Sequence, residues 1–225
     1  MKTNLLFSFF SLTVFFLACQ VKSNGEKTKA QEATSTQIKE VDLEGLHKAY
    51  FASGCFWCVE AVYESVKGVE ESISGYAGGH TKNPTYASSN TGKTGHAEAV
   101  EIFYDSTVVD FPTLVDVYFG SQNISQVNGQ GPDRGSQYRS IIFYQNAEEL
   151  RIINEKIEAL NEEIAPDKVA AEVMPFEKFW VGEDYHQNYE RLHPNQGYIR
   201  GVSVPRLKRF QKKFPQLIKK DGMAH

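Results

Sequence analysis

Two cysteines three positions apart, in the segment SGCFWCVEAVYESV (53–66), are the residues of this sequence whose spacing points most directly to chemistry. A strand is predicted at 48–52 and a helix directly after Gly54, because apolar residues then recur at helical spacing. Unpaired N–H groups and partial positive charge at a helix start stabilise an anion, so the pKa of Cys55 is expected to fall below that of a free thiol. Cys55 is therefore predicted to be a nucleophile, with Cys58 one turn away and able to form a disulfide with it.

Other interpretations of the pair are a buried inert pair, a zinc site and a thioredoxin-like disulfide exchanger. Zinc usually takes four ligands, so His186 and His193 would have to join the cysteines, and their spacing is wider than that of known zinc motifs. A thioredoxin-like protein also places CxxC at a helix start after a strand. Disulfide exchange needs an open surface, however, whereas Phe56 and Trp57 indicate a slot for a small apolar group.

The third cysteine lies in a separate N-terminal segment. Residues 1–18 have a Lys followed by an apolar run, which is shorter than the roughly 20 residues of a membrane-spanning helix and typical of a signal peptide. The segment ends in FLAC (16–19), which resembles the lipobox of bacterial lipoproteins. We therefore expect an exported protein facing the periplasm or cell exterior, attached to the membrane only through a lipid on Cys19. The alternative is an ordinary signal peptide that leaves Cys19 free.

The rest of the chain predicts one domain. Residues 19–42 are polar and are expected to form a flexible tether, residues 43–218 have a globular composition, and residues 219–225 form a tail. The whole chain has 225 residues, of which 41% are hydrophobic, and this is enough for one well-filled core. The formal charge of −4 gives no reason to expect a nucleic-acid partner, and we expect a monomer.

Strand and helix patterns interleave along the domain. Further strands are predicted at 96–105, 138–144 and 169–176, and helices at 110–120, from residue 147 and at 205–220, with long loops at 75–95 and 126–137. These elements predict an α+β fold, a two-layer sandwich in which helices pack on a mixed sheet with a ferredoxin-like core. The basic helix 205–220 could touch an anionic membrane, but Leu207, Phe210 and Phe214 favour packing on the core.

Six blocks of the sequence resemble the A-type peptide methionine sulfoxide reductases and occur in that family's order. They are GCFW (54–57), GYAGG (75–79), NPTY (83–86), TGHAEAVEI (94–102), DRGSQYRS (133–140) and EDYHQNY (183–189). The resemblance implies an enzyme that reduces the S epimer of methionine sulfoxide, free or in proteins, as oxidative damage repair. It also implies that no cofactor or metal is needed, and that a thioredoxin-like or other dithiol reductant is the partner.

The proton donor is predicted both from strand pattern and from the family. Glu98 shares strand parity with Val100 and Ile102, so it is expected to point among apolar side chains, where a carboxylic acid stays neutral near pH 7. Glu101 points the other way, with Ala97, Ala99 and Phe103, so both faces carry apolar residues and strand parity alone favours Glu98 only modestly. The Glu of the family's Gly-His-Ala-Glu motif is the acid catalyst and falls on Glu98.

The resemblance carries the remaining roles onto this sequence. It assigns Cys55 as the nucleophile that becomes a sulfenic acid. It implies that Phe56 and Trp57 form a pocket for the methyl group, and that the hydroxyls of Tyr86 and Tyr138 bind the sulfoxide oxygen. It also implies that Asp133 positions substrate and water, and that Tyr189 and His186 line the site.

Two departures from the family pattern are specific to this chain. Cys58 stands where the family usually has Gly, and the tail segment GYIRGVSVPRLKRF (197–210) lacks the recycling cysteine that many members carry there. Cys58 is therefore predicted to resolve the Cys55 sulfenic acid as a local disulfide. The segment QNIS (122–125) replaces a His-Asp/Asn-Pro-Thr stretch and is expected to affect access to the site. A redox-relay oxidoreductase and a non-catalytic lipoprotein binding domain remain the alternative functions.

Overall fold

The computed structural model describes residues 43–220, so the predicted signal peptide, Cys19, the tether and residues 221–225 lie outside the described residues. The strands, in chain order, are β1 (His47–Ala52), β2 (Val69–Ala77), β3 (Ala97–Tyr104), β4 (Gly129–Gln130), β5 (Asp133–Arg134), β6 (Ile141–Tyr144), β7 (Glu172–Pro175) and β8 (Phe179–Val181). The α-helices are α1 (Phe56–Glu64), α2 (Tyr86–Ser89), α3 (Phe111–Gly120), α4 (Ala147–Glu163), α5 (Tyr189–Leu192) and α6 (Val204–Lys213). Short 3-10 helices are η1 (Ser136–Tyr138), η2 (Asp184–His186) and η4 (Pro215–Leu217), and η3 (Ile199–Ser203) is a π-helix.

Six of the strands form one sheet in the order β7-β6-β1-β3-β2-β8, and β4 pairs with β5 in a separate ribbon. Strands β6 and β7 are parallel, whereas all other neighbours in the large sheet are antiparallel. The central order β6-β1-β3-β2, with α1 between β1 and β2 and α3 between β3 and β6, is the ferredoxin-like arrangement of split βαβ units. The predicted α+β fold with a mixed sheet is therefore confirmed.

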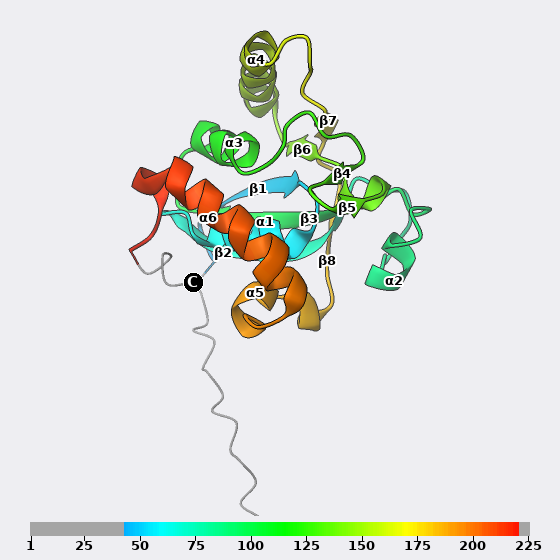
Figure 1. The fold of residues 1–225 in the computed structure, drawn as a ribbon. Helices are drawn as coiled ribbons and strands as arrows, with labels where there is room; N and C mark the ends of the chain where they lie inside the picture. The colour runs from blue at the N-terminus through cyan, green and yellow to red at the C-terminus, as the bar shows by residue number, and fades with distance from the viewer. Residues whose placement is uncertain (1–42, 221–225) are drawn as a thin grey trace, which may run out of the picture. The chain divides into compact units, whose positions relative to one another are not determined.

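Both faces of the sheet are covered. Helix α1 packs on the face that carries Phe51, Val100 and Ile102, and α6 runs across α1 (Figure 1). On the other face, Phe176 and Phe179 pack on the sheet, and the Phe176 ring stacks on Tyr50 with 3.6 Å between centroids. As a result, every residue of the central strand β3 is buried.

The C-terminal helix packs as its apolar spacing predicts. Leu207 and Phe210 of α6 are each 1% exposed in the core, and Phe214 packs against the same core at the helix end. The break near Pro215 separates α6 from η4, also as predicted. None of the helices between residues 43 and 220 has the length and apolar character that crossing a membrane needs.

The predicted loop 75–95 is wrong at two places. Strand β2 extends through Gly75 to Ala77, because Gly75 lets β8 pair closely: a Cβ there would lie 2.3 Å from the carbonyl oxygen of Trp180. Within the same segment, α2 forms on a reciprocal capping box between Thr85 and Ser88. Neither the strand pairing at Gly75 nor the capping box of α2 could be recognised in the sequence of this Gly- and Asn-rich segment.

The turn between β1 and α1 depends on Gly54. Its φ is +75°, and a Cβ at this position would lie 2.5 Å from Cβ of Gln130 in β4. Because Gly54 has a left-handed backbone conformation and no side chain, the β4–β5 ribbon can pack directly against it.

We expect Gly54→Ala to lower the free energy of unfolding by about 1–3 kcal/mol, because alanine is strained at this φ and must displace Gln130. Gly197→Ala is the matched control, since a Cβ there meets nothing within 4 Å. Urea unfolding of the two variants measures the difference. Equal stabilities would contradict this account of the turn.

Candidate active site

The two cysteines lie where the strand-turn-helix pattern predicts them. Cys55 is the N-cap of α1, and its carbonyl oxygen accepts hydrogen bonds from the N–H groups of Cys58 at 3.1 Å and Val59 at 3.3 Å. Both cysteines are free thiols and both are buried, with 7% of Cys55 and 2% of Cys58 exposed. The first turn of α1 thus holds both sulfurs within the core.

Glu98 reaches the same helix start from β3. Its carboxyl is 2% exposed and accepts a hydrogen bond from the N–H of Phe56, the first residue of α1, at 3.0 Å. Burial raises the pKa of Glu98 to about 8 against the opposing effect of this hydrogen bond. The carboxyl is therefore mostly protonated at neutral pH. The strand parity of Glu98 with Val100 and Ile102 is confirmed, and Glu101 lies on the opposite face.

The expected low pKa of Cys55 is wrong. Burial raises the pKa of this thiol, and its hydrogen bond to Cys58 acts in the same direction. The helix start cannot reverse this, because the Phe56 N–H is donated to Glu98 and not to the sulfur. For Cys58 the hydrogen bond from Cys55 and the nearby Arg206 guanidinium outweigh burial and lower the pKa to about 7. Of the two thiols, Cys58 therefore has the lower pKa.

A small pocket opens on the Cys55 side of α1. Its volume is about 230 Å³, and its lining combines the first thiol, the acid, aromatic rings and hydroxyl groups: Cys55, Phe56, Trp57, Tyr86, Glu98, Asp133, Tyr138, Gln196 and Tyr198. Burial raises the pKa of Tyr86 and of Tyr138, so both hydroxyls remain protonated donors at neutral pH. The structure thus brings together seven of the sequence-predicted residues around one cavity.

Two residues that were predicted to line the site, Tyr189 and His186, contact Trp57 instead of lining the pocket. Tyr189 stacks on Trp57 with 3.7 Å between ring centroids, and the Trp57 Nε1–H donates to His186 Nδ1 at 3.1 Å. Neither residue is part of the pocket lining, although both contact Trp57, which is. Burial lowers the pKa of His186, so the imidazole is neutral. Both residues hold Trp57 in place.

Sequence reasoning missed two residues that order the site. The hydroxyl of Tyr198 donates to Asp133 Oδ2 at 2.5 Å and lies 3.7 Å from the sulfur of Cys58. Glu183 accepts the N–H of Tyr86 at 2.9 Å and the hydroxyl of Tyr76 at 2.8 Å. Glu183 opens the EDYHQNY block, which was a usable signal. Tyr198 lies in the tail segment 197–210, outside the six blocks that resemble the family, and no pattern in the sequence marks it.

The QNIS segment does not line this pocket. Gln122 Oε1 instead accepts hydrogen bonds from Ser53 and Ser140 at 2.8 Å each and from Gln130 at 3.1 Å. This network fixes the turn before Cys55, so the segment supports the site although it does not line the pocket. Among residues 43–220, no group of three or more His, Cys, Asp or Glu side chains is arranged to hold a metal ion.

Comparison with known proteins gives a consistent result. The family model described as "Peptide methionine sulfoxide reductase" matches residues 47–218. The peptide methionine sulfoxide reductase MsrA of Polynucleobacter asymbioticus is 43% identical over 183 residues, which cover 81% of this chain and 96% of that protein. The MsrA of Pasteurella multocida is 45% identical over 172 residues, which cover 76% of this chain and 98% of that protein.

Solved structures agree with these relatives. Methionine sulfoxide reductase A of Corynebacterium diphtheriae superimposes with a TM-score of 0.62 and 31% identity, covering 68% of this chain and 77% of that one. Reduced Mxr1 from Saccharomyces cerevisiae has a TM-score of 0.63 and 28% identity, covering 67% of this chain and 87% of that one.

The raised pKa of Glu98 predicts a pH-dependent loss of stability. Between its ordinary value of 4.5 and its folded value of about 8, the unfolded chain releases a proton that the folded chain retains. Stability from this group is therefore full below pH 4.5 and is lost as pH rises to about 8. We expect Glu98→Gln to be more stable than wild type at pH 8, by on the order of 2–4 kcal/mol, and the gap to shrink at pH 5.

Urea unfolding at both pH values measures this difference. Glu101→Gln is the matched control on the same strand, because Glu101 accepts hydrogen bonds from Lys48 at 3.1 Å and Tyr50 at 2.8 Å. Its loss should lower stability. A Glu98→Gln variant that is less stable than wild type at pH 8 would show that the buried carboxyl is not protonated.

Proposed function

Since the chain belongs to the peptide methionine sulfoxide reductase family and is an enzyme of that type, we propose that it reduces the S epimer of methionine sulfoxide with Cys55, Glu98 and Cys58 as the reacting groups. The observation that carries these roles is a buried carboxylic acid, with a pKa of about 8, in one small pocket with a thiol. Free sulfoxide and sulfoxide in proteins are both proposed substrates.

The pocket matches the chemical parts of the substrate. The rings of Phe56 and Trp57, 6.2 Å apart between centroids, form an apolar wall for the methyl group. The hydroxyls of Tyr86 and Tyr138 face the same cavity and would donate to the sulfoxide oxygen as negative charge develops there. Glu98 would then supply a proton to that oxygen.

The proposed thiol chemistry begins with transfer of the Cys55 proton to Cys58. Cys55 attacks the substrate sulfur as its own proton passes to the Cys58 thiolate, to which it is hydrogen bonded. The oxygen then passes from the substrate sulfur to the Cys55 sulfur. Its bond to the substrate sulfur and the transient bond between the two sulfurs break, methionine leaves, and Cys55 becomes a sulfenic acid. Cys58 then attacks the Cys55 sulfur, and water leaves as the disulfide forms. A dithiol reductant of the thioredoxin type restores both thiols, so two electrons reduce one sulfoxide to methionine and water.

The proposed location rests on the sequence alone. FLAC (16–19) supports a lipid on Cys19, which would place the enzyme at a membrane facing the periplasm or exterior. Incorporation of labelled palmitate that persists in Cys19→Ser would contradict the anchor.

Cysteine variants test the proposed order of events. Pre-reduced wild type, freed of reductant, should convert one equivalent of S sulfoxide and end with a Cys55–Cys58 disulfide. Cys55→Ser should convert none. Cys58→Ser should convert one equivalent more slowly and stop at a sulfenic acid, because it lacks the proton acceptor and the resolving thiol. Mass spectrometry of the quenched enzymes distinguishes these products.

Resolved sulfoxide epimers complete this experiment. Conversion of the R epimer alone would contradict the proposed substrate. A sulfenic acid that accumulates in wild type with Cys58 still reduced would contradict the resolving role.

Glu98→Gln separates sulfoxide reduction from disulfide exchange. Loss of a general acid should slow the single-turnover rate by about 10²–10⁴-fold. Reduction of a preformed Cys55–Cys58 disulfide by dithiothreitol should be nearly unchanged, because that reaction needs no proton for an oxygen. In wild type the sulfoxide rate should fall as pH rises through about 8, where Glu98 ionises. An unchanged sulfoxide rate in the variant would favour a disulfide exchanger instead.

A further inference from the structure

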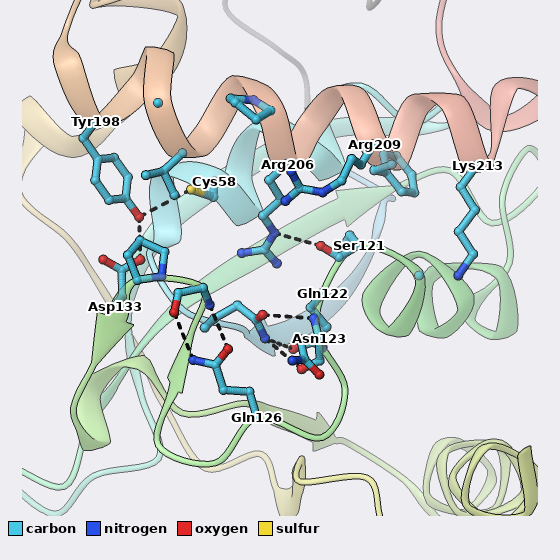
Figure 2. Close-up of a pocket in the computed structure, with 18 residues that line it drawn as sticks. Cys58, Ser121, Gln122, Asn123, Gln126, Asp133, Tyr198, Arg206, Arg209 and Lys213 are labelled. Carbon is cyan, nitrogen blue, oxygen red and sulfur yellow. Dashed lines mark hydrogen bonds between the residues drawn. The ribbon is translucent and has the colours of Figure 1, made fainter. Parts of the chain in front are cut away.

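Cys58 lines a second and larger cavity, which adjoins the small pocket at Asp133 and Tyr198. This groove has a volume of about 760 Å³ and is lined by the end of α3 and residues 121–126 on one side and by η3 and α6 on the other (Figure 2). Cys58 lines the groove but not the small pocket, and Cys55 lines the small pocket but not the groove. The two sulfurs of the redox pair therefore open toward different cavities.

Tyr198 and Asp133 form the partition between these cavities. Both residues line the groove and the small pocket, and the Tyr198 hydroxyl donates to Asp133 Oδ2 at 2.5 Å. The same hydroxyl lies 3.7 Å from the Cys58 sulfur (Figure 2). A molecule in the groove can thus approach Cys58 without entering the substrate pocket.

The groove is positively charged along α6. Arg206, Arg209 and Lys213 line it from successive turns of this helix. Arg206 is held by hydrogen bonds to the carbonyl oxygens of Ser121 at 2.9 Å and Ser53 at 2.8 Å, so its charge is fixed beside Cys58. Among the described lining residues, Asp133 carries the one carboxylate, and it already accepts the Tyr198 hydroxyl.

We propose that this groove is the docking site of the dithiol reductant, a protein with acidic residues beside its attacking cysteine, and that it delivers that cysteine to Cys58. The inference rests on the proposed function, because it needs the Cys55–Cys58 disulfide as its target. Charge complementarity with α6 favours an acidic partner and speeds its association. Substrate and reductant then use separate entrances to one disulfide.

The exchange has two balanced steps. The reductant thiolate attacks the Cys58 sulfur, the bond between Cys58 and Cys55 breaks, and Cys55 leaves as a thiolate that takes up a proton. The second thiol of the reductant, after losing its proton, attacks the reductant's first sulfur and releases Cys58 as a thiolate. The reductant ends as a disulfide. The lowered pKa of Cys58 favours this release, since thiols of low pKa leave faster.

Charge reversal on α6 tests the docking site. The enzyme is first oxidised with one equivalent of methionine sulfoxide, and the rate of disulfide reduction by a thioredoxin of net negative charge is then measured. Reversal of Arg209 and Lys213 to Glu should slow this rate about tenfold at low salt. The matched control reverses Lys208 and Lys212, exposed cations of the same helix that do not line the groove, and should leave the rate unchanged.

A neutral dithiol distinguishes docking from reactivity. Dithiothreitol should reduce the wild-type and both charge-reversed disulfides at equal rates. Gly201→Phe adds a steric test, because Gly201 lines the groove and a Cβ there meets nothing within 4 Å, so a phenylalanine can be accommodated and should narrow the groove. Gly197→Phe, which also has open space but lies outside the lining, is its control. Gly201→Phe should slow thioredoxin and leave single-turnover sulfoxide reduction unchanged.

The outcomes separate the two proposals. If one equivalent of sulfoxide fails to produce the disulfide in wild type, the proposed function fails. If the disulfide forms but thioredoxin reduces the Arg209/Lys213 and Gly201 variants at the wild-type rate, the docking site is wrong. Equal slowing in the Lys208/Lys212 control would also overturn it, because the effect would then be general attraction to a basic helix.

Discussion

The contact between the Glu98 carboxyl and the Phe56 N–H, at 3.0 Å, is the interaction on which the rest of the site depends. It joins the central strand β3 to the first residue of α1 and places an acid within the core at the one point where a helix offers an unpaired donor. Because both faces of β3 are covered, the carboxyl is shielded from water and keeps its proton at neutral pH. The same contact uses the donor that would otherwise stabilise a Cys55 thiolate.

The two cysteines differ because their surroundings differ. Burial raises the pKa of Cys55, whereas the hydrogen bond from Cys55 and the nearby guanidinium of Arg206 lower the pKa of Cys58. A pair that is symmetric in sequence therefore has a raised pKa at the thiol that lines one cavity and a lowered pKa at the thiol that lines the other. Tyr198 stands between the cavities and contacts both Cys58 and Asp133, so the partition is itself part of the hydrogen-bonded site.

Much of this arrangement could be predicted from local pattern. Strand parity placed Glu98 on one face with Val100 and Ile102, and Gly54 with the apolar spacing after it placed Cys55 at a helix start. The direction of the Cys55 pKa could not be predicted, because it depends first on how deeply the fold buries this thiol and then on its hydrogen bond to Cys58. Strand β8 and the extension of β2 were missed for a similar reason. In the sequence Gly75 indicates a loop. Its role as a strand residue depends on the backbone of β8, which packs closely against it.

The position of Cys58 also changes what the C-terminal segment has to do. In the proposed cycle Cys58 resolves Cys55 from one helical turn away, so no distant cysteine has to travel to the site. The segment after α5 can therefore be packed firmly, and it is: Leu207 and Phe210 are buried on the core. Arg206 donates hydrogen bonds to the carbonyl oxygens of Ser53, just before the Cys55 turn, and of Ser121, at the end of α3. In the proposed cycle this segment becomes the fixed wall of the groove that receives the reductant.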